Sequence, residues 1–153
     1  MWFSLTRAAG VIQRHVLGMF LPAFIAGPLV DRWGSRPVAW LGCLLLTTSA
    51  TIALSGQSEV FFLVSSFCLG LGWNLMLVAG TTLLSEGHEA SERGQAQALM
   101  ELGNGGLAAL MTFASGALLV NIGWSAVNLL VLPMLFIAAL ALWSLRKPQA
   151  QTD

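Results

Sequence analysis

The hydrophobic positions of this 153-residue chain form long continuous runs separated by short polar stretches. A helix that crosses a bilayer needs about 20 mostly apolar residues. Backbone polar groups in lipid must be hydrogen-bonded within the protein, which leaves only helices or closed barrels. Because the apolar residues do not alternate with polar ones, the pattern favours helices. It predicts five spans, over residues 9–29, 38–54, 59–84, 92–120 and 124–145.

The composition agrees with this pattern. Hydrophobic residues make up 56% of the chain and charged residues only 9%, whereas a soluble domain carries about 25% charged residues. We therefore predict an all-α integral membrane protein surrounded by membrane lipid. The net charge is zero, so there is no reason to expect a nucleic-acid partner. Cys43 and Cys68 lie inside apolar runs, which favours buried thiols over a disulfide or a metal site.

Basic residues predict the orientation of the chain. Five spans put two polar loops, residues 27–37 and 85–94, and the C-terminal tail on the same side of the membrane. Short loops rich in Lys and Arg stay in the cytoplasm. That side holds five basic residues, against Arg7 and Arg14 on the other, and we expect it to be cytoplasmic. The five are Arg32, Arg36, Arg93, Arg146 and Lys147. Tryptophans near the span ends, such as Trp124 and Trp143, are expected in the interfacial aromatic belts.

The fourth predicted span carries a polar stripe. Its members follow one another at intervals of three or four residues, which places them on one helix face: Gln97, Glu101, Asn104, Ala108, Thr112 and Ser115. Lipid does not accept such a face, so the stripe either lines a cavity or forms a polar seam between helices. Glu101 is the candidate for proton coupling, because ionisable groups inside a membrane mark substrate and proton pathways.

The third predicted span has Trp73 and Asn74 near its midpoint, where tryptophan is unusual. The pair fits an aromatic platform in a solute cavity, and it fits equally a packed ring whose nitrogen finds a partner inside the bundle. Gly70 and Gly72, just before, are expected to allow close helix contact rather than to touch a ligand.

The first predicted span contains a histidine and a face of small residues. His15 either relays protons, since histidine titrates near neutral pH, or reaches the interface together with Arg14. Gly18, Pro22 and Ala26 are spaced by four, which predicts a face that another helix can approach and a kink at the proline.

Metal and enzyme motifs are not indicated. His88 stands among Glu86, Glu89 and Glu92, but this composition is typical of a solvated loop, so we predict no metal site. The sequence has no nucleophile elbow, no phosphate-binding glycine loop, no zinc spacing and no nucleotide fingerprint. We therefore expect neither enzymatic activity nor a cofactor.

The first polar loop resembles the signature G-x-x-x-D-R-x-G-x-R of major facilitator superfamily transporters. The residues that fill this pattern are Gly27, Asp31, Arg32, Gly34 and Arg36. A weaker likeness is the second loop, which ends in Glu92, Arg93 and Gly94 before a helix. The run that begins with Gly72, Trp73 and Asn74 is similar to the C-terminal half of bacterial permeases of this family. The resemblance extends over essentially the whole chain.

The family has twelve helices in two similar halves. The five predicted spans would correspond to helices two to six of a half, with residues 1–153 forming one partial domain. The short tail after the fifth span, and the absence of a glycine-proline antiporter motif in the fourth, favour the C-terminal half. The resemblance implies a bacterial inner-membrane permease whose small-molecule substrate binds between the halves. The partner would then be the missing N-terminal half, and the chain a fragment of a longer protein.

The family mechanism implies that residues 27–37, here named the latch loop, gate the cavity. Asp31 is expected to meet the positive start of the fourth span, and Arg32 or Arg36 to pair with Glu86 or Glu92. The complete latch set is Gly27, Asp31, Arg32, Gly34, Arg36, Glu86, Glu92 and Arg93. The candidate substrate or proton pathway consists of His15, Trp73, Asn74, Gln97, Glu101 and Asn104.

Two functional hypotheses follow from these observations. The first is secondary active transport of a small organic solute, with proton coupling through Glu101 as an option. The second is a non-transporting remnant or an accessory bundle that packs against another membrane subunit. A reading frame upstream of Met1 that encodes the remaining helices would favour the first hypothesis.

Overall fold

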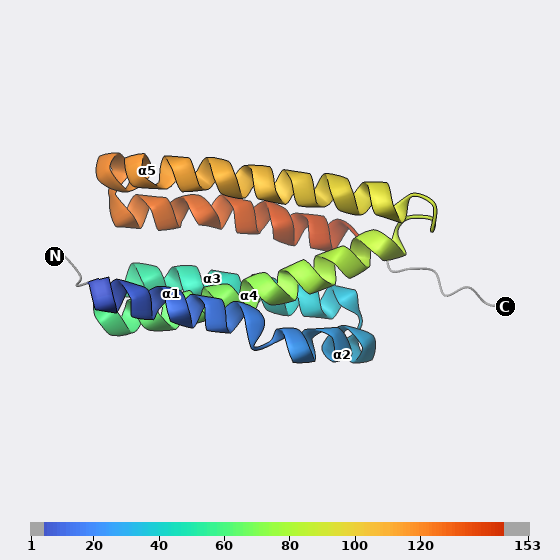
Figure 1. Cartoon of the computed structure of the whole chain (residues 1–153), viewed down its shortest axis with the longest axis horizontal. Coiled ribbons are helices and arrows are strands. Elements are labelled where there is room, and N and C mark those ends of the chain that lie inside the picture. The colour runs from blue at the N-terminus through green and yellow to red at the C-terminus, as the bar shows by residue number, and fades with distance from the viewer. Residues whose placement is uncertain (1–4, 146–153) are drawn as a thin grey trace.

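A computed structural model describes residues 5–145 of the chain, and all its regular elements are α-helices (Figure 1). The predicted all-α membrane-type bundle is therefore confirmed. The helices run roughly along one long axis, as expected for segments that cross a bilayer. They are α1 (Leu5–Phe20), α2 (Ala23–Trp33), α3 (Ser35–Ser55), α4 (Glu59–Glu86) and α5 (Arg93–Ser144).

The first predicted span is broken into α1 and α2 by a turn at Leu21 and Pro22. Proline lacks the N–H that would continue the helical ladder, and its ring clashes with the preceding turn. The Pro22 carbonyl then accepts the N–H of Ala26 at 2.8 Å, which starts α2. The kink predicted at Pro22 is present, and α2 continues as far as Trp33.

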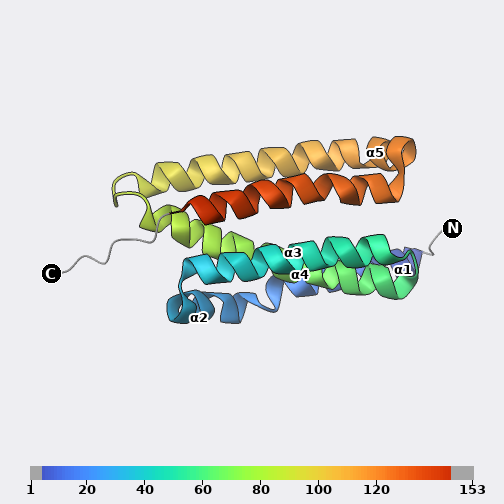
Figure 2. The same ribbon diagram turned by 180° about the vertical axis from the view of Figure 1, so that it is seen from behind.

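The helix α5 reverses direction at Gly123, so that it consists of two antiparallel arms (Figures 1 and 2). Gly123 has a φ of +79°, a conformation that side chains with a Cβ rarely adopt. We name residues 93–122 the first arm and residues 124–144 the second arm. They correspond closely to the fourth and fifth predicted spans.

Four segments of the described chain are long and apolar enough to cross a membrane: Ala9–Trp33, Ser35–Ser55, Glu59–Glu86 and Gly116–Ser144. The last of these includes the turn at Gly123 and the second arm. The first arm before Gly116 falls outside these segments, because it carries the polar residues predicted to form a stripe.

The core of the bundle lies where α4 packs between α3 and α1, while α2 covers one end (Figure 2). Its buried side chains are mostly small: Ala26, Val30, Val38, Ala39, Cys43, Leu75, Ala79 and Leu142. Helices in lipid gain little from the hydrophobic effect and associate through close van der Waals packing, which small residues permit. The core is therefore a contact between backbones more than a cluster of large side chains.

Glycines create the close approach between α1 and α4. A Cβ on Gly18 would lie 2.6 Å from the Phe67 carbonyl oxygen, and one on Gly70 would clash with the His15 carbonyl oxygen. Gly18, Pro22 and Ala26 are all buried. The prediction of a small-residue face that another helix approaches is confirmed, and α4 is that helix.

A second glycine contact joins α3 to α4. A Cβ on Gly42 would lie 2.9 Å from the Met76 nitrogen, and one on Gly72 would lie 3.0 Å from the Gly42 carbonyl oxygen. The prediction that Gly70 and Gly72 serve close helix contact is therefore also confirmed.

The second arm of α5 is fixed to α3 at both ends and at its middle. Three hydrogen bonds do this: Trp124 Nε1 to Ala53 O at 2.9 Å, Cys43 Sγ to Leu135 O at 3.9 Å, and Arg36 Nη2 to Trp143 O at 3.2 Å. The Trp124 ring also meets Phe62 edge-on, with ring centroids 4.8 Å apart. Trp124 thus packs between helices, where the sequence predicted only an interfacial belt residue, and it holds the Gly123 turn onto α3 and α4.

Candidate functional site: a cavity between α4 and the first arm of α5

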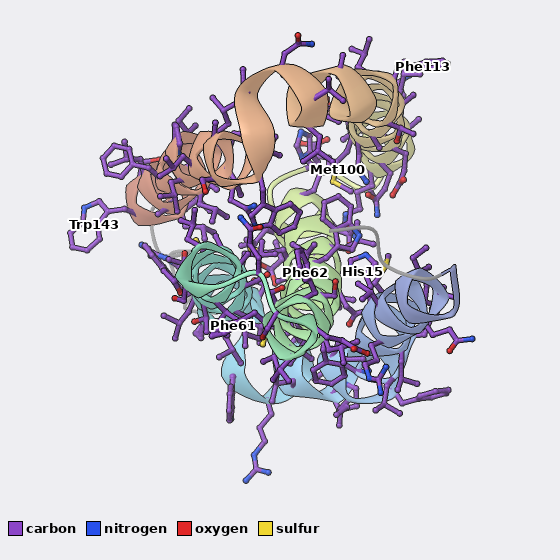
Figure 3. All side chains as sticks on the ribbon, turned by 90° about the vertical axis from the view of Figure 1, so that its left-hand side faces the viewer. His15, Phe61, Phe62, Met100, Phe113 and Trp143 are labelled. Carbon is purple, nitrogen blue, oxygen red and sulfur yellow. The ribbon has the colours of Figure 1, made fainter. Side chains whose placement is uncertain are left out.

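A cavity of about 210 Å³ lies between α4 and the first arm of α5. Four of its lining residues recur at helical spacing on one face of α4, and two come from the first arm one turn apart. These residues are Trp73, Met76, Leu77, Gly80, Met100 and Asn104. Figure 3, seen along the helices, shows Met100 between the first arm and α4. A Cβ at Gly80 would meet no atom within 4 Å among the described residues, so this glycine leaves the cavity wall open.

The cavity brings together two of the predicted pathway residues. Trp73 and Asn104 are 31 positions apart in the sequence and line the same space. Trp73 is 37% exposed, so its ring is not enclosed by packing, and this favours the platform interpretation of the tryptophan. The lining is otherwise apolar, apart from the Asn104 amide. Such a wall can hold a flat apolar ring and offer it one hydrogen-bonding group at the edge.

Asn74 points away from this cavity. Its side chain is 8% exposed, and its Oδ1 has no hydrogen-bond partner among the described residues. Gln97, seven residues before Asn104 on the first arm, also has a buried Oε1 without a partner in the described part of the chain. Buried polar atoms of this kind cost about 1–3 kcal/mol each, and they are rare enough to require an explanation.

Most of the remaining stripe faces out of the bundle. Glu101, Ala108 and Thr112 are exposed, and the Thr112 hydroxyl donates to the Ala108 carbonyl at 2.8 Å within its own helix. Glu101 is not among the residues that line the cavity. Within the described part of the chain, Glu101 is therefore not sheltered by α1–α4.

His15 lies against α4 and is hydrogen-bonded to the backbone of that helix. Its Nδ1 donates to the Ser66 carbonyl oxygen at 3.1 Å, which fixes the Nδ1–H tautomer, and the side chain is half-buried. In Figure 3 the labelled His15 is directed from α1 towards the centre of the bundle. Its neighbour Arg14 is exposed and donates to the Gly10 carbonyl at 3.3 Å. His15 therefore contributes to the α1–α4 contact.

The latch loop is a tight turn between α2 and α3. Gly34 has a φ of +87°, and its N–H donates to the Val30 carbonyl at 2.7 Å, which ends α2. A residue with a Cβ would be strained there, which accounts for this glycine of the signature. Gly27 has space around it, since a Cβ would meet no described atom within 4 Å. Asp31 and Arg32 are exposed at the end of α2.

The contacts of the latch loop differ from those expected. Within residues 5–145, α2 and α5 do not approach each other, so Asp31 does not meet the start of α5 in this conformation. The Ser35 hydroxyl donates to Glu86 Oε2 at 2.8 Å. Arg32 or Arg36 was expected to pair with Glu86 or Glu92; Arg36 donates instead to the Trp143 carbonyl at 3.2 Å. A cation at the last turn of a helix interacts favourably with the free carbonyl groups there.

The second charged loop is closed by its own contacts. Arg93 Nε donates to the His88 carbonyl at 3.2 Å, and His88 Nδ1 donates to the Leu84 carbonyl at 2.7 Å. Glu92 is exposed, and its N–H donates to the Glu89 carbonyl at 2.9 Å, one turn before α5.

Ser35 was not among the predicted latch residues, although a serine at the start of a helix is a recognisable signal. Its hydroxyl and the positive start of α3 together hold the Glu86 carboxylate. The link between the two charged loops that the sequence predicted is therefore present, but its members are Ser35 and Glu86.

The fold and the cavity define a polytopic helical membrane protein with an aromatic, amide-edged space between two helices. The family model described as Major Facilitator Superfamily matches residues 7–153, and the chain belongs to this family. The prediction made from the loop signature is confirmed.

Several relatives are named transporters. The chain is 36% identical over 146 residues to the "Riboflavin transporter RfnT" of Brucella anthropi, covering 95% of this chain and 37% of that protein. It is 34% identical over 110 residues to the "Uncharacterized MFS-type transporter YdeG" of Bacillus subtilis, covering 71% of this chain and 25% of that protein. It is 29% identical over 72 residues to the "Multidrug resistance protein MdtL" of Shewanella oneidensis, covering 47% of this chain and 18% of that protein. No solved structure matches the chain.

Proposed function

We propose that this chain forms part of a secondary transporter that moves a small organic solute across a membrane. The observation that carries the proposal is the meeting of Trp73 and Asn104 in one cavity between α4 and the first arm. An aromatic face and an amide, on helices of membrane-spanning length, are suited to bind a solute and release it again. The membership of the major facilitator superfamily supports the same activity.

The size of the cavity supports a shared site. Pockets for small molecules usually measure about 300–1,000 Å³, and this one measures about 210 Å³. The chain spans 37% of the length of the riboflavin transporter relative. We propose that an N-terminal half, on the same polypeptide or on another, completes the site. The exposed Glu101 is the group that such a half would cover. Burial by that half would be required for Glu101 to couple transport to protons.

We propose a flat heteroaromatic ring as the recognised feature of the solute. The ring would stack on Trp73, and its polar edge would hydrogen-bond the Asn104 amide. Riboflavin, the solute in the name of one relative, has such a ring system and is the first compound to test. The thioethers of Met76 and Met100, which also line the cavity, adapt readily to a ring placed between them.

We further propose that the latch loop, residues 27–37, is a conformational latch on the cytoplasmic side of a bacterial inner membrane, with the C-terminus on that same side. The basic residues of the sequence support this orientation. Ser35–Glu86 and Arg36–Trp143 are polar contacts at that end of the bundle, and each joins two helices. Exposed polar contacts contribute about 0–1 kcal/mol each, so they bias one conformation without fixing it.

The test is riboflavin uptake by a riboflavin-auxotrophic bacterium that expresses the complete reading frame containing this chain. Trp73→Ala should raise the KM for riboflavin about fivefold, which corresponds to a stacking contribution of about 1 kcal/mol. Phe24→Ala is the control, because Phe24 is 87% exposed near the start of α2 and lies outside both the cavity and the latch loop. Equal kinetics for wild type and Trp73→Ala, at equal membrane levels, would overturn the assignment of the cavity. Absence of uptake of riboflavin and of other flat heteroaromatic solutes would overturn the solute class.

A further inference from the structure

A second space, of about 340 Å³, lies on another side of the bundle, between α3 and the second arm of α5. It is lined by Trp40, Cys43, Leu44, Thr47, Leu132, Leu135, Phe136 and Ala139. These residues recur at helical spacing on both helices, so the space is a groove that runs along the two helix axes. Leu44 and Phe136 are 63% and 65% exposed, which leaves the groove open towards the surroundings of the bundle. It shares no lining residue with the candidate solute cavity.

The hydroxyl and the thiol of the groove are already hydrogen-bonded within the protein. The Thr47 hydroxyl donates to the Cys43 carbonyl at 2.9 Å, and the Cys43 thiol donates to the Leu135 carbonyl at 3.9 Å. The remaining lining is aliphatic or aromatic. A hydrocarbon chain therefore suits this groove, because the hydroxyl and the thiol of its wall already have partners within the protein.

One end of the groove carries a positive charge. Arg36 precedes Trp40 by one helical turn on α3, and Trp143 follows Ala139 by one turn on the second arm. Arg36 Nη2 donates to the Trp143 carbonyl at 3.2 Å and so closes this end of the groove. A guanidinium group has five N–H donors, and this hydrogen bond occupies one of them. Glu86, at the same end of the bundle, accepts the Ser35 hydroxyl.

We propose that the groove between α3 and the second arm is a binding site for an anionic phospholipid. One acyl chain lies along the groove, and the phosphate of the head group meets Arg36 at its end. Both helices belong to segments apolar enough to cross a membrane, so the medium that surrounds the open groove is lipid. Tryptophans at the head-group level, here Trp40 and Trp143, are typical of such sites, and basic pockets between helices at a membrane surface bind anionic head groups.

A phospholipid fits the groove better than a further helix does. An α-helix with its side chains is about 10–12 Å across, so a helix would lie over the groove and fill its space of about 340 Å³ only with single side chains. A single acyl chain is narrow and flexible. The charge also distinguishes between lipids, because Arg36 attracts a phosphate whose negative charge is not balanced by a choline group.

The experiment is native mass spectrometry of the detergent-purified chain with phosphatidylglycerol or phosphatidylcholine. Wild type should bind phosphatidylglycerol about fivefold more tightly, the factor that corresponds to about 1 kcal/mol for one basic residue at a membrane surface. Arg36→Gln should bind both lipids equally. Arg32→Gln, which removes the same charge from the exposed end of α2, should keep the preference of the wild type. Inorganic phosphate should not displace the lipid, since it lacks the acyl chain.

A second variant tests the groove itself. Ala139→Leu places three more carbon atoms in the groove and should weaken binding of both lipids, with helix content by circular dichroism as the control for folding. An unchanged preference in Arg36→Gln would overturn the proposal, as would unchanged affinity in Ala139→Leu. If Arg36→Gln does not fold, the result for Ala139→Leu decides. Riboflavin uptake has no part in this test, so its outcome is independent of the proposed transport activity.

Discussion

Two glycine-rich regions of this chain differ in what surrounds their glycines. In α4 and its neighbours, Gly70 and Gly72 bring backbones so close that a single methyl group would clash. In the first arm, a Cβ would meet no described atom within 4 Å at any of the five glycines, Gly94, Gly103, Gly105, Gly106 and Gly116. Small residues in membrane helices permit close approach of another helix. The first region uses that property within α1–α4, whereas the first arm has no helix of the described chain on its glycine positions.

The difference extends to the large side chains. Phe113 on the first arm is 90% exposed and points away from the bundle in Figure 3, while Phe62 on α4 packs against Trp124. The α1–α4 region is thus a packed unit, held to the second arm by three hydrogen bonds. The first arm carries the polar stripe and one wall of the solute cavity, but it makes few contacts with α4. This division is the one expected if another half of the transporter packs on the first arm, as proposed above.

The largest expected effect is at the α1–α4 contact. Gly70→Leu should lower the free energy of unfolding by about 3 kcal/mol, because the atoms it meets belong to the backbone of α1, the His15 carbonyl and the Met19 nitrogen. The two helices would have to separate to admit the side chain. Unfolding of the detergent-solubilised chain by sodium dodecyl sulfate, followed by circular dichroism, measures the change.

The same substitution on the first arm is the control. Gly105→Leu meets open space, and leucine favours a helix over glycine by about 1 kcal/mol, so stability should stay equal or rise slightly. Equal losses in Gly70→Leu and Gly105→Leu would contradict the distinction between the two regions.

A smaller effect is expected where α5 is attached to the packed unit. Trp124→Ala removes the hydrogen bond to the Ala53 carbonyl and the edge-on contact with Phe62, and it should cost about 2–3 kcal/mol. Trp143→Ala should cost far less, because that side chain is 77% exposed and its hydrogen bond to Arg36 uses the backbone carbonyl. Thermal unfolding in detergent measures both. If the two variants lose the same stability, Trp124 does not anchor the turn.

The smallest expected effect concerns the contact between the two charged loops. Ser35→Ala removes the hydrogen bond to Glu86 and should cost about 1 kcal/mol or less. In the complete transporter it should change the rate of uptake, since the proposed latch would open more easily. Ser55→Ala is the control, because the Ser55 hydroxyl donates only to Thr51 within its own helix. A latch made by Ser35 and Glu86 is refuted if Ser35→Ala and Ser55→Ala transport at the rate of the wild type.

Much of the fold could be predicted from the sequence. In lipid, a long continuous apolar run fits a helix, so the spans and the polar loops between them could be read from the order of residues. The break at Pro22 followed from the proline itself. The roles of Gly18, Gly70 and Gly72 were also predictable, because glycine inside a membrane helix has few uses other than close contact. For the site, spacing placed Asn104 on the stripe, and its position near the middle of a span singled out Trp73.

Other features could not be predicted. A helix that is apolar on every side has no periodicity to show which side faces which neighbour. The sequence treated Trp73 and Asn74 as a pair, yet Trp73 lines the cavity and Asn74 is buried elsewhere, because adjacent residues point about 100° apart on a helix. The partner of Arg36 could not be predicted either. It is the backbone carbonyl of Trp143, 107 positions away, and every residue has such a carbonyl.

The sequence by itself determined that this chain is a bundle of membrane helices of the major facilitator superfamily with two charged loops at one end. These properties depend on hydropathy, on local backbone chemistry and on a short motif, all of which are read along the chain. Only the tertiary structure decided which residues come together: Trp73 and Asn104 in one cavity, Ser35 with Glu86, and Arg36 with the end of α5. Those meetings depend on the rotation of each helix about its axis, which is set by glycine contacts between segments far apart in sequence.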